Sequence, residues 1–439
     1  MATKLNTPDL RPLAPVLERC AQNDRSFLIP ALLDAQTIYG YLPEPVIEAI
    51  GQHLRVPLVE IHGVIEFYSM LYSELIGKTI VRVCTSPMCA QVGGREAFQA
   101  VRAHLGVDAL ESTEDGQYMV EEVPCIGFCD HAPAALIGDT PVSRVDAASP
   151  GIWINEPKAA PRSFVGGEPR WLTSRCGEIE PTDLPAFEAH GGFAGLRRAL
   201  EQMQPGEVVE EVKTSALMGR GGAAFPTGLK WEYTAAVQSD VRYIVCNGDE
   251  SEPGTFKDRL LMEGDPYAIL EGMTIAGYAI GAQKGYLYIR GEYPRAHRIL
   301  EKAIQNALAG GYLGEDILGS RFSFEIEIRS GAGAYICGEE TALFESIEGK
   351  RGYPRLKPPF PTTDGLFGQP TVINNIETLC AAAWILKNGA AEYRSIGTAG
   401  SPGSKLFCLS GDVARRGVYE VPFGIQLGEL IDLAGGVEG

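Results

Sequence analysis

Four cysteines in two short motifs constrain the fold more than any other feature of this 439-residue sequence. Cys84 and Cys89 lie in CTSPMC, and Cys125 and Cys129 lie in CIGFC, with 35 residues between the motifs. The β-branched run TIVRVC ends at the first cysteine, and the run YMVEEVPC ends at the third. Such runs predict strands, and the amphipathic run GGREAFQAVRAHLGV between them predicts a helix. We therefore expect residues 76–145 to form a compact α/β unit with thiols at its strand ends.

The spacing of the paired cysteines indicates which group they bind. Soft thiolates in two pairs can hold zinc or an iron–sulfur cluster. Structural zinc sites normally use C-x2-C turns, whereas C-x4-C and C-x3-C loops better suit a wider cluster with two irons. A catalytic disulfide would need C-x-x-C at a helix start, which is absent. We favour the two-iron cluster, with zinc and unliganded cysteines as the alternatives.

The remaining six cysteines stand alone, and we expect them to be small buried hydrophobic residues. They are Cys20, Cys176, Cys246, Cys337, Cys380 and Cys408.

The overall charge excludes one class of partner. The chain has 38 basic and 56 acidic residues, which give a net charge of −18, and it has no block of five like charges. A nucleic-acid ligand is disfavoured because phosphate neutralisation requires clustered Lys and Arg. No run reaches 18 apolar residues and the N-terminus has no apolar signal region, so we expect a cytoplasmic protein without a membrane span.

The order of sequence patterns predicts several units. Residues 1–75 contain apolar helical patches interrupted by prolines and predict a small helical unit. Residues 146–205 are rich in Pro, Gly and Ser, and predict a connector with one short helix, FAGLRRALEQM. In residues 206–400, apolar strands alternate with helices, which is typical of a largely parallel sheet. Residues 401–439 predict a hairpin and a helix.

The stretch GAGAYICGEETALFESIEG resembles a phosphate-binding loop in its glycine spacing. Gly333 and Gly338 are separated by four residues, but Glu339, Glu340 and Thr341 occupy the positions where an NTPase has Lys and Ser/Thr. The two carboxylates would repel an oligophosphate, and no cation within the stretch offsets them. This loop is therefore expected to bind something other than a nucleoside triphosphate.

Three further stretches carry polar or flexible residues suited to a ligand. In LMGRGGAAFPTGLKWEY, glycines allow close backbone approach, and a single lysine follows them. In CNGDESEPGTFKDR, an Asn and three carboxylates follow a strand and can accept hydrogen bonds from ribose or ribityl hydroxyls. In PPFPTTDGLFGQPTVINNIETL, a proline-framed Phe360 can stack on a heterocycle, and an Asn pair enters a helix. Taken singly, the first two stretches also fit a surface glycine turn and a solvated acidic turn.

With these motifs in this order, the sequence resembles two subunits of respiratory complex I. Residues 10–140, with FYSMLYSE ahead of the cysteine motifs, resemble the thioredoxin-like [2Fe–2S] subunit. Residues 171–439 resemble the NADH-binding FMN subunit through the four long motifs quoted above. The resemblance implies an α/β protein with a thioredoxin-like domain over 76–145, a Rossmann-like FMN/NADH domain over 206–400 and a partial β-grasp (SLBB-like) domain over 401–439.

The resemblance also implies site residues. The four paired cysteines match the cluster ligands. The positions that match the flavin lining are Gly219, Gly221, Gly222, Lys230, Asn247, Asp249, Tyr335, Gly338, Glu339, Glu340, Asn374 and Asn375. The positions that match the dinucleotide side are Phe225, Tyr233, Glu250, Glu252 and Phe360. Carboxylates there should repel a 2′-phosphate, so we expect NADH to be preferred over NADPH through Glu252 and Glu340.

The implied activity is that of an NADH dehydrogenase module. Hydride would pass from NADH to FMN without a catalytic side chain, and single electrons would pass to iron–sulfur clusters and on to quinone. The implied partners are other iron–sulfur subunits, with peripheral attachment to the inner membrane through them. The alternatives are a module of an NAD-dependent formate dehydrogenase or NAD-reducing hydrogenase, a non-catalytic iron–sulfur relay or scaffold, and a thioredoxin-like zinc protein.

The sequence departs from the family at two places. The family has GAGFP where this chain has Ala223, Ala224 and Phe225, so one extra methyl lies near the expected flavin and slightly weaker flavin binding is predicted. The family's FMN subunit also continues into a helical domain with a Cys-rich [4Fe–4S] motif, which this sequence lacks. We interpret the sequence as a fragment or a C-terminally truncated form, and the alternative is a protein that passes its electrons on by another route.

Overall fold

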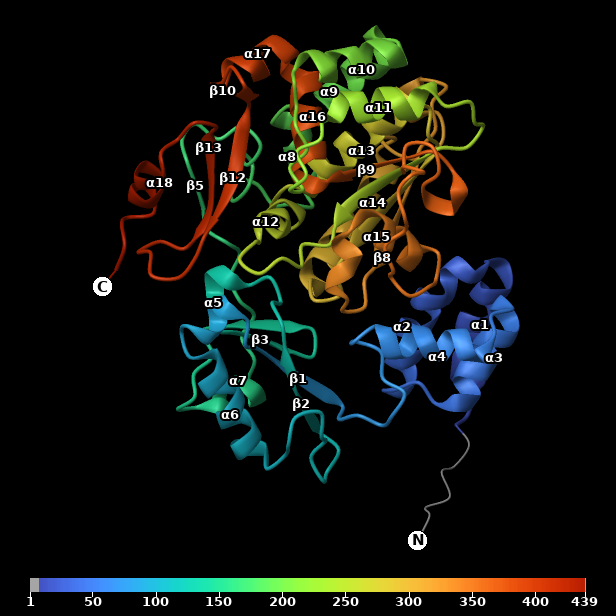
Figure 1. The fold of residues 1–439 in the computed structure, drawn as a ribbon, viewed down its shortest axis with the longest axis vertical. Coiled ribbons are helices and arrows are strands. Elements are labelled where there is room, and N and C mark those ends of the chain that lie inside the picture. The colour runs from blue at the N-terminus through green and yellow to red at the C-terminus, as the bar shows by residue number, and fades with distance from the viewer. Residues whose placement is uncertain (1–7, 439) are drawn as a thin grey trace.

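A parallel four-stranded sheet forms the centre of the C-terminal half of the chain in the computed structural model, which describes residues 8–438 (Figure 1). The strand order is β8-β7-β6-β9, and every adjacent pair is parallel. The strands are β6 (Tyr243–Gly248), β7 (Lys284–Ile289), β8 (Glu325–Ser330) and β9 (Thr371–Asn375). This arrangement confirms the parallel sheet that the alternating sequence pattern predicts.

Helices connect these strands, because parallel neighbours need crossover connections. The longest is α14, of 16 residues, and α13, of 15 residues, contacts both β6 and β7. The helices of this half are α8 (Leu184–Ala189), α9 (Ala194–Gln202), α10 (Pro205–Thr214), α11 (Thr227–Ala236), α12 (Lys257–Gly264), α13 (Pro266–Ile280), α14 (Pro294–Ala309), α15 (Glu340–Ile347), α16 (Ile376–Asn388) and α17 (Ala390–Ser395).

The two faces of the sheet belong to two different hydrophobic cores. Ile244 and Cys246 of β6 pack into the core that contains α13 and α16, whereas Val245 between them packs into a second core. This follows from the alternation of side chains along a strand. The second core includes Ile50 and Tyr68 of the N-terminal unit, so that unit covers one face of the sheet.

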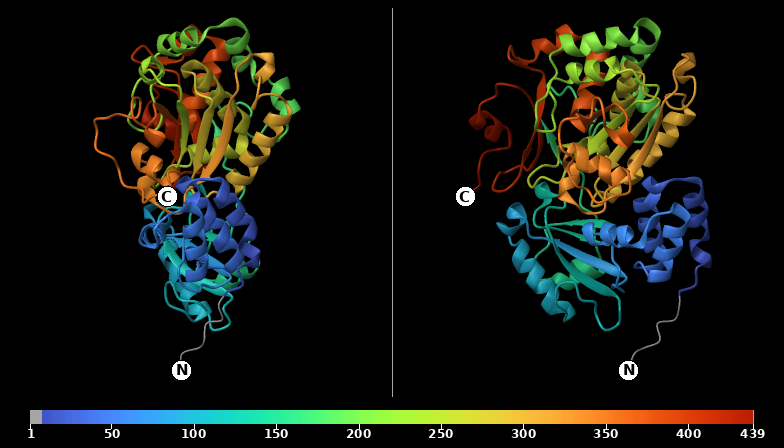
Figure 2. Two further views of the ribbon diagram at one scale, coloured as in Figure 1. Left: turned by 90° about the vertical axis from the view of Figure 1, so that its right-hand side faces the viewer. Right: turned by 45° about the vertical axis from the view of Figure 1, so that its right-hand side comes forward.

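From residue 8 onwards, the N-terminal unit contains four α-helices and two short 3-10 turns. The α-helices are α1 (Ala14–Gln22), α2 (Leu28–Tyr39), α3 (Glu44–Leu54) and α4 (Leu58–Phe67). Gly40 ends α2 in the left-handed conformation, and α3 begins with a proline in its first turn. The helical unit and the thioredoxin-like unit lie on the same side of the C-terminal half (Figure 2).

The thioredoxin-like unit contains a four-stranded sheet in the order β2-β1-β3-β4. Strands β1 and β2 are parallel, and β1 and β3 are antiparallel. Its elements are β1 (Thr79–Cys84), α5 (Pro87–Ala90), α6 (Gly94–Leu105), β2 (Tyr118–Val123), β3 (Ala134–Ile137), β4 (Thr140–Ser143) and α7 (Pro150–Asn155). Helix α6 packs on this sheet through Ala97, Phe98 and Val101.

A third, small sheet joins the expected connector to the C-terminal segment. Strands β12 (Ser404–Leu409) and β13 (Gly417–Pro422) form the predicted hairpin, and α18 (Leu427–Leu433) follows. Residues 146–205 contain three helices and also β5 (Val165–Gly166), which pairs with β13. The prediction of a connector with one helix was therefore wrong, because contacts with distant residues order a Pro/Gly-rich segment. The short strands β10 (Gly397–Thr398) and β11 (Ser401–Pro402) form a separate pair.

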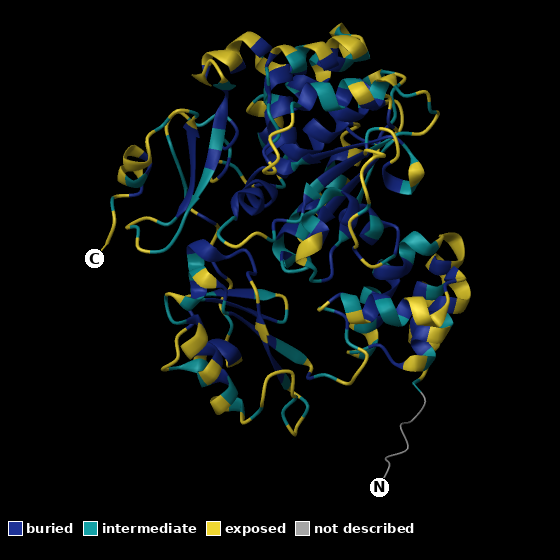
Figure 3. Cartoon of the chain, viewed as in Figure 1, coloured by how far each residue is buried: buried dark blue, intermediate teal, exposed yellow. Residues whose placement is uncertain are grey.

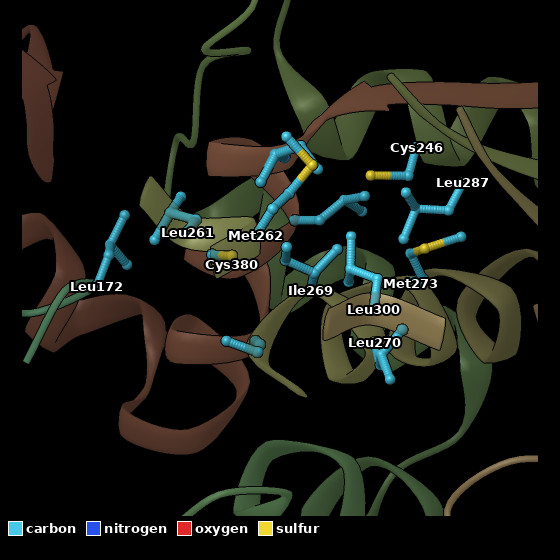
Figure 4. Close-up of a cluster of buried hydrophobic side chains, with 14 of the residues drawn as sticks. Leu172, Cys246, Leu261, Met262, Ile269, Leu270, Met273, Leu287, Leu300 and Cys380 are labelled. Carbon is cyan, nitrogen blue, oxygen red and sulfur yellow. The ribbon is translucent and has the colours of Figure 1, made fainter. Parts of the chain in front are cut away.

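The lone cysteines lie mostly in the buried parts of the fold. Figure 3 shows that α12 and the central strands are buried, while exposed positions concentrate on outer helices and loops. Cys246 and Cys380 lie among Leu and Met side chains (Figure 4). Cys20, Cys176 and Cys337 are also buried, so five of the six lone cysteines pack as predicted, while Cys408 is only partly buried. None of the helices described is long and apolar enough to cross a membrane.

Candidate functional site

The four paired cysteines lie together at one end of the thioredoxin-like sheet. Cys84 is the last residue of β1, Cys89 lies in α5, and Cys125 and Cys129 belong to the loop after β2. All four side chains are buried and none forms a disulfide. The Sγ atoms of Cys125 and Cys129 are 3.3 Å apart. Cys84 and Cys89 form a second pair, in which each side chain shifts the pKa of the other. The fold thus brings together the thiols that the sequence singled out.

The thiols form two pairs. Among the described residues, no three His, Cys, Asp or Glu side chains surround one ion position. The hydrogen bond from Cys129 lowers the pKa of Cys125 to about 6, and the hydrogen bond from Cys89 lowers the pKa of Cys84. The thiolate of Cys125 is therefore favoured near neutral pH, and thiolates are the form that binds metal. Two pairs suit a cluster in which each iron takes two sulfurs better than they suit a single zinc ion.

The second site lies at the carboxyl end of the parallel sheet, where open α/β folds bind ligands. Asn247 is near the end of β6, and its side-chain amide donates to the Gly338 carbonyl over 2.9 Å. Asp249 follows, and burial raises the pKa of its carboxyl to about 7. A Cβ atom on Gly338 would lie 3.4 Å from the Asp249 carbonyl oxygen, so this position is in close contact with the strand end.

The loop before α11 approaches the same edge of the sheet. Gly222 has a φ of +112°, which favours glycine, and a Cβ atom on Gly221 would lie 3.2 Å from the Cβ of Asn375. Gly219 is fixed by its N–H, which donates to the Phe225 carbonyl at 2.9 Å. Ala224 keeps a left-handed φ of +51° at the position where the resembled family has glycine.

Lys230 on α11 is the single lysine predicted to face the flavin. Its Nζ donates to the Ile373 carbonyl at 3.0 Å and lies 3.9 Å from Oε2 of Glu340. Burial lowers the pKa of Lys230, partly offset by that carboxylate. The Phe225 ring centroid lies 6.0 Å from Nζ. A cation, a carboxylate and an aromatic ring thus converge beside β9.

The two glutamates after the glycine loop pair with a lysine that lies outside the stretch GAGAYICGEETALFESIEG. Lys357 Nζ lies 3.0 Å from Glu339 Oε1 and 2.5 Å from Glu340 Oε1. Glu339 also caps α15 by accepting from the N–H groups of Thr341 and Ala342. The expectation that no nearby cation offsets these carboxylates holds only within the stretch, because Lys357 reaches them from the following loop.

The residues predicted for the dinucleotide side are mostly at the surface. The Tyr335 hydroxyl donates to the carboxylate of Glu252, and both side chains are exposed. Tyr233 lies one turn after Lys230 on α11. The four predicted aromatic residues are all exposed, at 43% for Phe225, 51% for Tyr233, 60% for Tyr335 and 57% for Phe360. Exposed rings at the rim of a polar site can stack on a planar ligand.

Three predicted site residues make hydrogen bonds within the protein. Both carboxyl oxygens of Glu250 accept backbone N–H groups at the start of α12, each at 3.0 Å, and burial raises its pKa to about 7. The Asn374 amide oxygen accepts from Trp231 at 2.9 Å. The Asn375 side chain caps α16 and donates to Asp258. A buried carboxylate needs such partners, and the placement of Glu250 on the dinucleotide side stays a prediction.

Two buried arginines that sequence reasoning missed join the two sites. Arg259 of α12 donates to the Gly127 carbonyl at 3.0 Å and pairs with Asp130 at 2.8 Å, both in or next to the C-x3-C loop. Arg290, directly after β7, contacts the Cys125 carbonyl. The only signal in the sequence was their position at the end of a strand or the start of a helix, since contacts between distant residues leave no spacing pattern.

Family comparisons agree with the two expected domains. A model of a thioredoxin-like [2Fe–2S] ferredoxin matches residues 14–155, and a model of the Nuo51 FMN-binding domain matches residues 212–384. These matches confirm the expected [2Fe–2S] and FMN cofactors. The buried thiol pairs and the glycine-lined sheet edge provide donors that fit these two groups.

Individual relatives cover different lengths of the chain. The NAD-reducing hydrogenase HoxS subunit alpha of Cupriavidus necator is 38% identical over 96% of this chain and 72% of its own length. An NADH-quinone oxidoreductase subunit of Rhizobium meliloti is 55% identical over 57% of this chain and 59% of its own length. A crystal structure of an NAD+-reducing [NiFe]-hydrogenase in the H2-reduced state has a TM-score of 0.83 at 34% identity, over 93% of this chain and 69% of the other.

Proposed function

We propose that this chain, which belongs to the family that includes the alpha subunit of an NAD-reducing hydrogenase and a subunit of NADH-quinone oxidoreductase, is an NADH-oxidising module. Its FMN would take up a hydride from NADH and release single electrons to iron–sulfur clusters. The observation that carries the proposal is the contact of Arg259 with Gly127 at 3.0 Å. This contact fixes the helix after the flavin-side loop directly against the cysteine loop.

Each residue of the sheet edge has a role in this proposal. Gly221 and Gly222 let the backbone approach the flavin closely, and Lys230 supplies a cation that Ile373 and Glu340 hold in place. Asn247 ties the Gly338 loop to the end of β6. These groups bind and orient, and no side chain is needed as a general acid or base for hydride transfer.

The proposal includes a preference for NADH over NADPH. Glu252 is exposed and carries no cationic partner among its described contacts, so it would repel a 2′-phosphate. Glu340 contributes less than its charge suggests, because Lys357 and Lys230 lie at 2.5 Å and 3.9 Å from it. The preference therefore rests mainly on Glu252.

The partners and direction of electron flow are part of the proposal as well. We propose that other iron–sulfur subunits receive the electrons in a complex I-like assembly in the cytoplasm, peripheral to the inner membrane, with quinone as the final acceptor. The second candidate is the reverse reaction, reduction of NAD+ within a hydrogenase-type assembly. It is favoured by the alignment over 96% of this chain with a subunit of an NAD-reducing hydrogenase.

Flavin binding tests the proposal. FMN should bind the purified protein with quenching of its fluorescence, and Lys230→Ala should weaken binding at least tenfold because the fixed cation is lost. Lys302→Ala, at an exposed position on α14, is the matched control and should bind as the unchanged protein does. No binding of FMN by the unchanged protein would refute the proposed function. Equal binding by the two variants would refute the role of Lys230.

A further inference from the structure

Arg290 is a fully buried cation between the two sites. Its side chain is 3% exposed and follows β7 directly. Nη2 donates to the backbone carbonyl of Cys125 at 2.5 Å, and Nη1 donates to the backbone carbonyl of Glu250 at 2.6 Å. One guanidinium therefore binds a cysteine of the cluster site and a residue of the flavin-side loop.

The charges around Arg290 are few and identifiable. Glu292 pairs with it at 2.9 Å and is its nearest carboxylate, while Asp249 interacts at longer range. The guanidinium carbon lies 5.2 Å from the Tyr293 ring centroid. The positive charge of Arg82, in the thioredoxin-like sheet, also lowers the pKa of Glu292 and so favours the ionised carboxylate. Arg290 and Glu292 thus place opposite charges at the same boundary.

The sign of their effect on an adjacent redox group follows from electrostatics. Reduction of an iron–sulfur cluster adds one negative charge to it. A buried cation at hydrogen-bond distance from a ligand's carbonyl stabilises the added charge, because screening by water is weak there. A buried carboxylate at the same place makes the added negative charge less favourable. Arg290 should therefore raise the reduction potential of the cluster, and Glu292 should lower it.

We propose that Arg290 and Glu292 are positioning residues that set the reduction potential of the [2Fe–2S] cluster with opposite signs, and that Arg290 holds the cluster loop at a fixed place against the flavin-side loop. The inference rests on the proposed function for the presence of the cluster, and goes beyond it by naming residues outside the cysteine motifs. Removal of Arg290 loses a cation and leaves Glu292 unpaired, so both consequences lower the potential.

The test is a redox titration of the cluster-containing protein, with the EPR signal of the reduced cluster as readout. Arg290→Gln should shift the reduction equilibrium at least tenfold toward the oxidised cluster, which is about 59 mV for one electron. Glu292→Gln should shift it toward the reduced cluster, and Arg290→Lys should lie closest to the unchanged protein.

Arg329 provides a matched control. It is a buried arginine at the end of β8 that pairs with Glu327 at 2.7 Å and donates to a backbone carbonyl of another unit, that of Ser26, at 2.9 Å. Arg329→Gln should leave the cluster potential unchanged, although it removes a comparable structural contact.

The outcomes separate the inference from the proposed function. Shifts of opposite sign for Arg290→Gln and Glu292→Gln support the inference. Shifts of the same sign, or no shift in either, overturn it. If Arg290→Gln does not retain the cluster, Glu292→Gln decides alone, because a higher potential supports the inference and an unchanged or lower one overturns it. A protein without any [2Fe–2S] signal before substitution would remove the cluster assignment itself.

Discussion

The ammonium group of Lys357 lies 3.0 Å from the carboxylate of Glu339, at the start of the helix that follows the glycine loop. The same ammonium pairs with Glu340 at 2.5 Å, so one cation offsets two carboxylates beside the proposed dinucleotide site. Lys357→Ala should leave these charges facing the dinucleotide phosphates. We expect the KM for NADH to rise about threefold to tenfold, with a smaller rise at high salt because these partly exposed charges are screened.

The control for this variant is another lysine held by two glutamates. Lys350 lies 3.4 Å from Glu345 and 2.8 Å from Glu348. Its backbone carbonyl accepts a hydrogen bond from the Tyr68 hydroxyl, and substitution of the side chain leaves that carbonyl in place. Lys350→Ala should leave the KM within about twofold of the original value. A KM that rises equally in both variants would show that loss of any paired lysine disturbs the fold.

Glu252 should control the choice between NADH and NADPH. Glu252→Ala removes an exposed negative charge, so the ratio of kcat/KM for NADPH to that for NADH should rise about tenfold or more. Tyr335→Phe removes only the hydroxyl that binds Glu252 and keeps the charge, so its ratio should change little. Steady-state assays with both nucleotides give the ratios, and an unchanged ratio in Glu252→Ala would contradict the assignment.

Cys125 should be required for the cluster and not for flavin reduction. Cys125→Ser removes one thiolate but keeps the backbone carbonyl that Arg290 binds, so the flavin-side loop keeps its contact. We expect the [2Fe–2S] EPR signal to disappear while NADH still bleaches the flavin absorbance. Cys20→Ala, in the buried core of α1, should keep both signals. Retention of the cluster signal in Cys125→Ser would rule out this residue as a ligand.

Ala224 carries a backbone strain that glycine would relieve. Its φ of +51° costs an L-residue about 1–2 kcal/mol, whereas glycine adopts it freely but loses more chain entropy on folding. Ala224→Gly should therefore stabilise the protein by about 0.5–1 kcal/mol and bind FMN at least as tightly. Ala223→Gly has no such strain to relieve and should be destabilising. Thermal unfolding of both variants checks this, and shifts in the same direction would contradict it.

Local patterns were enough to predict the elements that carry the sites. Strand ends placed the thiols of Cys84 and Cys125, and the parallel sheet placed Asn247 beside the glycine loop, because both follow from side-chain periodicity and sheet topology. The resemblance grouped residues from four distant stretches, and the fold brings most of them to one edge of the sheet.

Contacts between distant residues could not be predicted in this way. Lys357 reaches Glu339 from a loop, and Arg290 reaches Cys125 from another unit, 165 positions away in the sequence. The internal partners of Glu250 were also missed, since its acidic motif predicts a ligand contact and gives no sign that both carboxyl oxygens accept N–H groups at the start of α12. The order in residues 146–205 likewise depends on β13, which lies more than 200 residues later.

The most direct test of the proposed function is an anaerobic titration of the FMN-supplemented protein with NADH, followed by visible absorbance and by low-temperature EPR at the end point. Bleaching of the flavin band together with a reduced [2Fe–2S] signal is the predicted result, because both sites lie in one chain and meet at Arg259 and Arg290. A flavin that NADH fails to reduce, or a reduced flavin beside a cluster that stays oxidised, would contradict it.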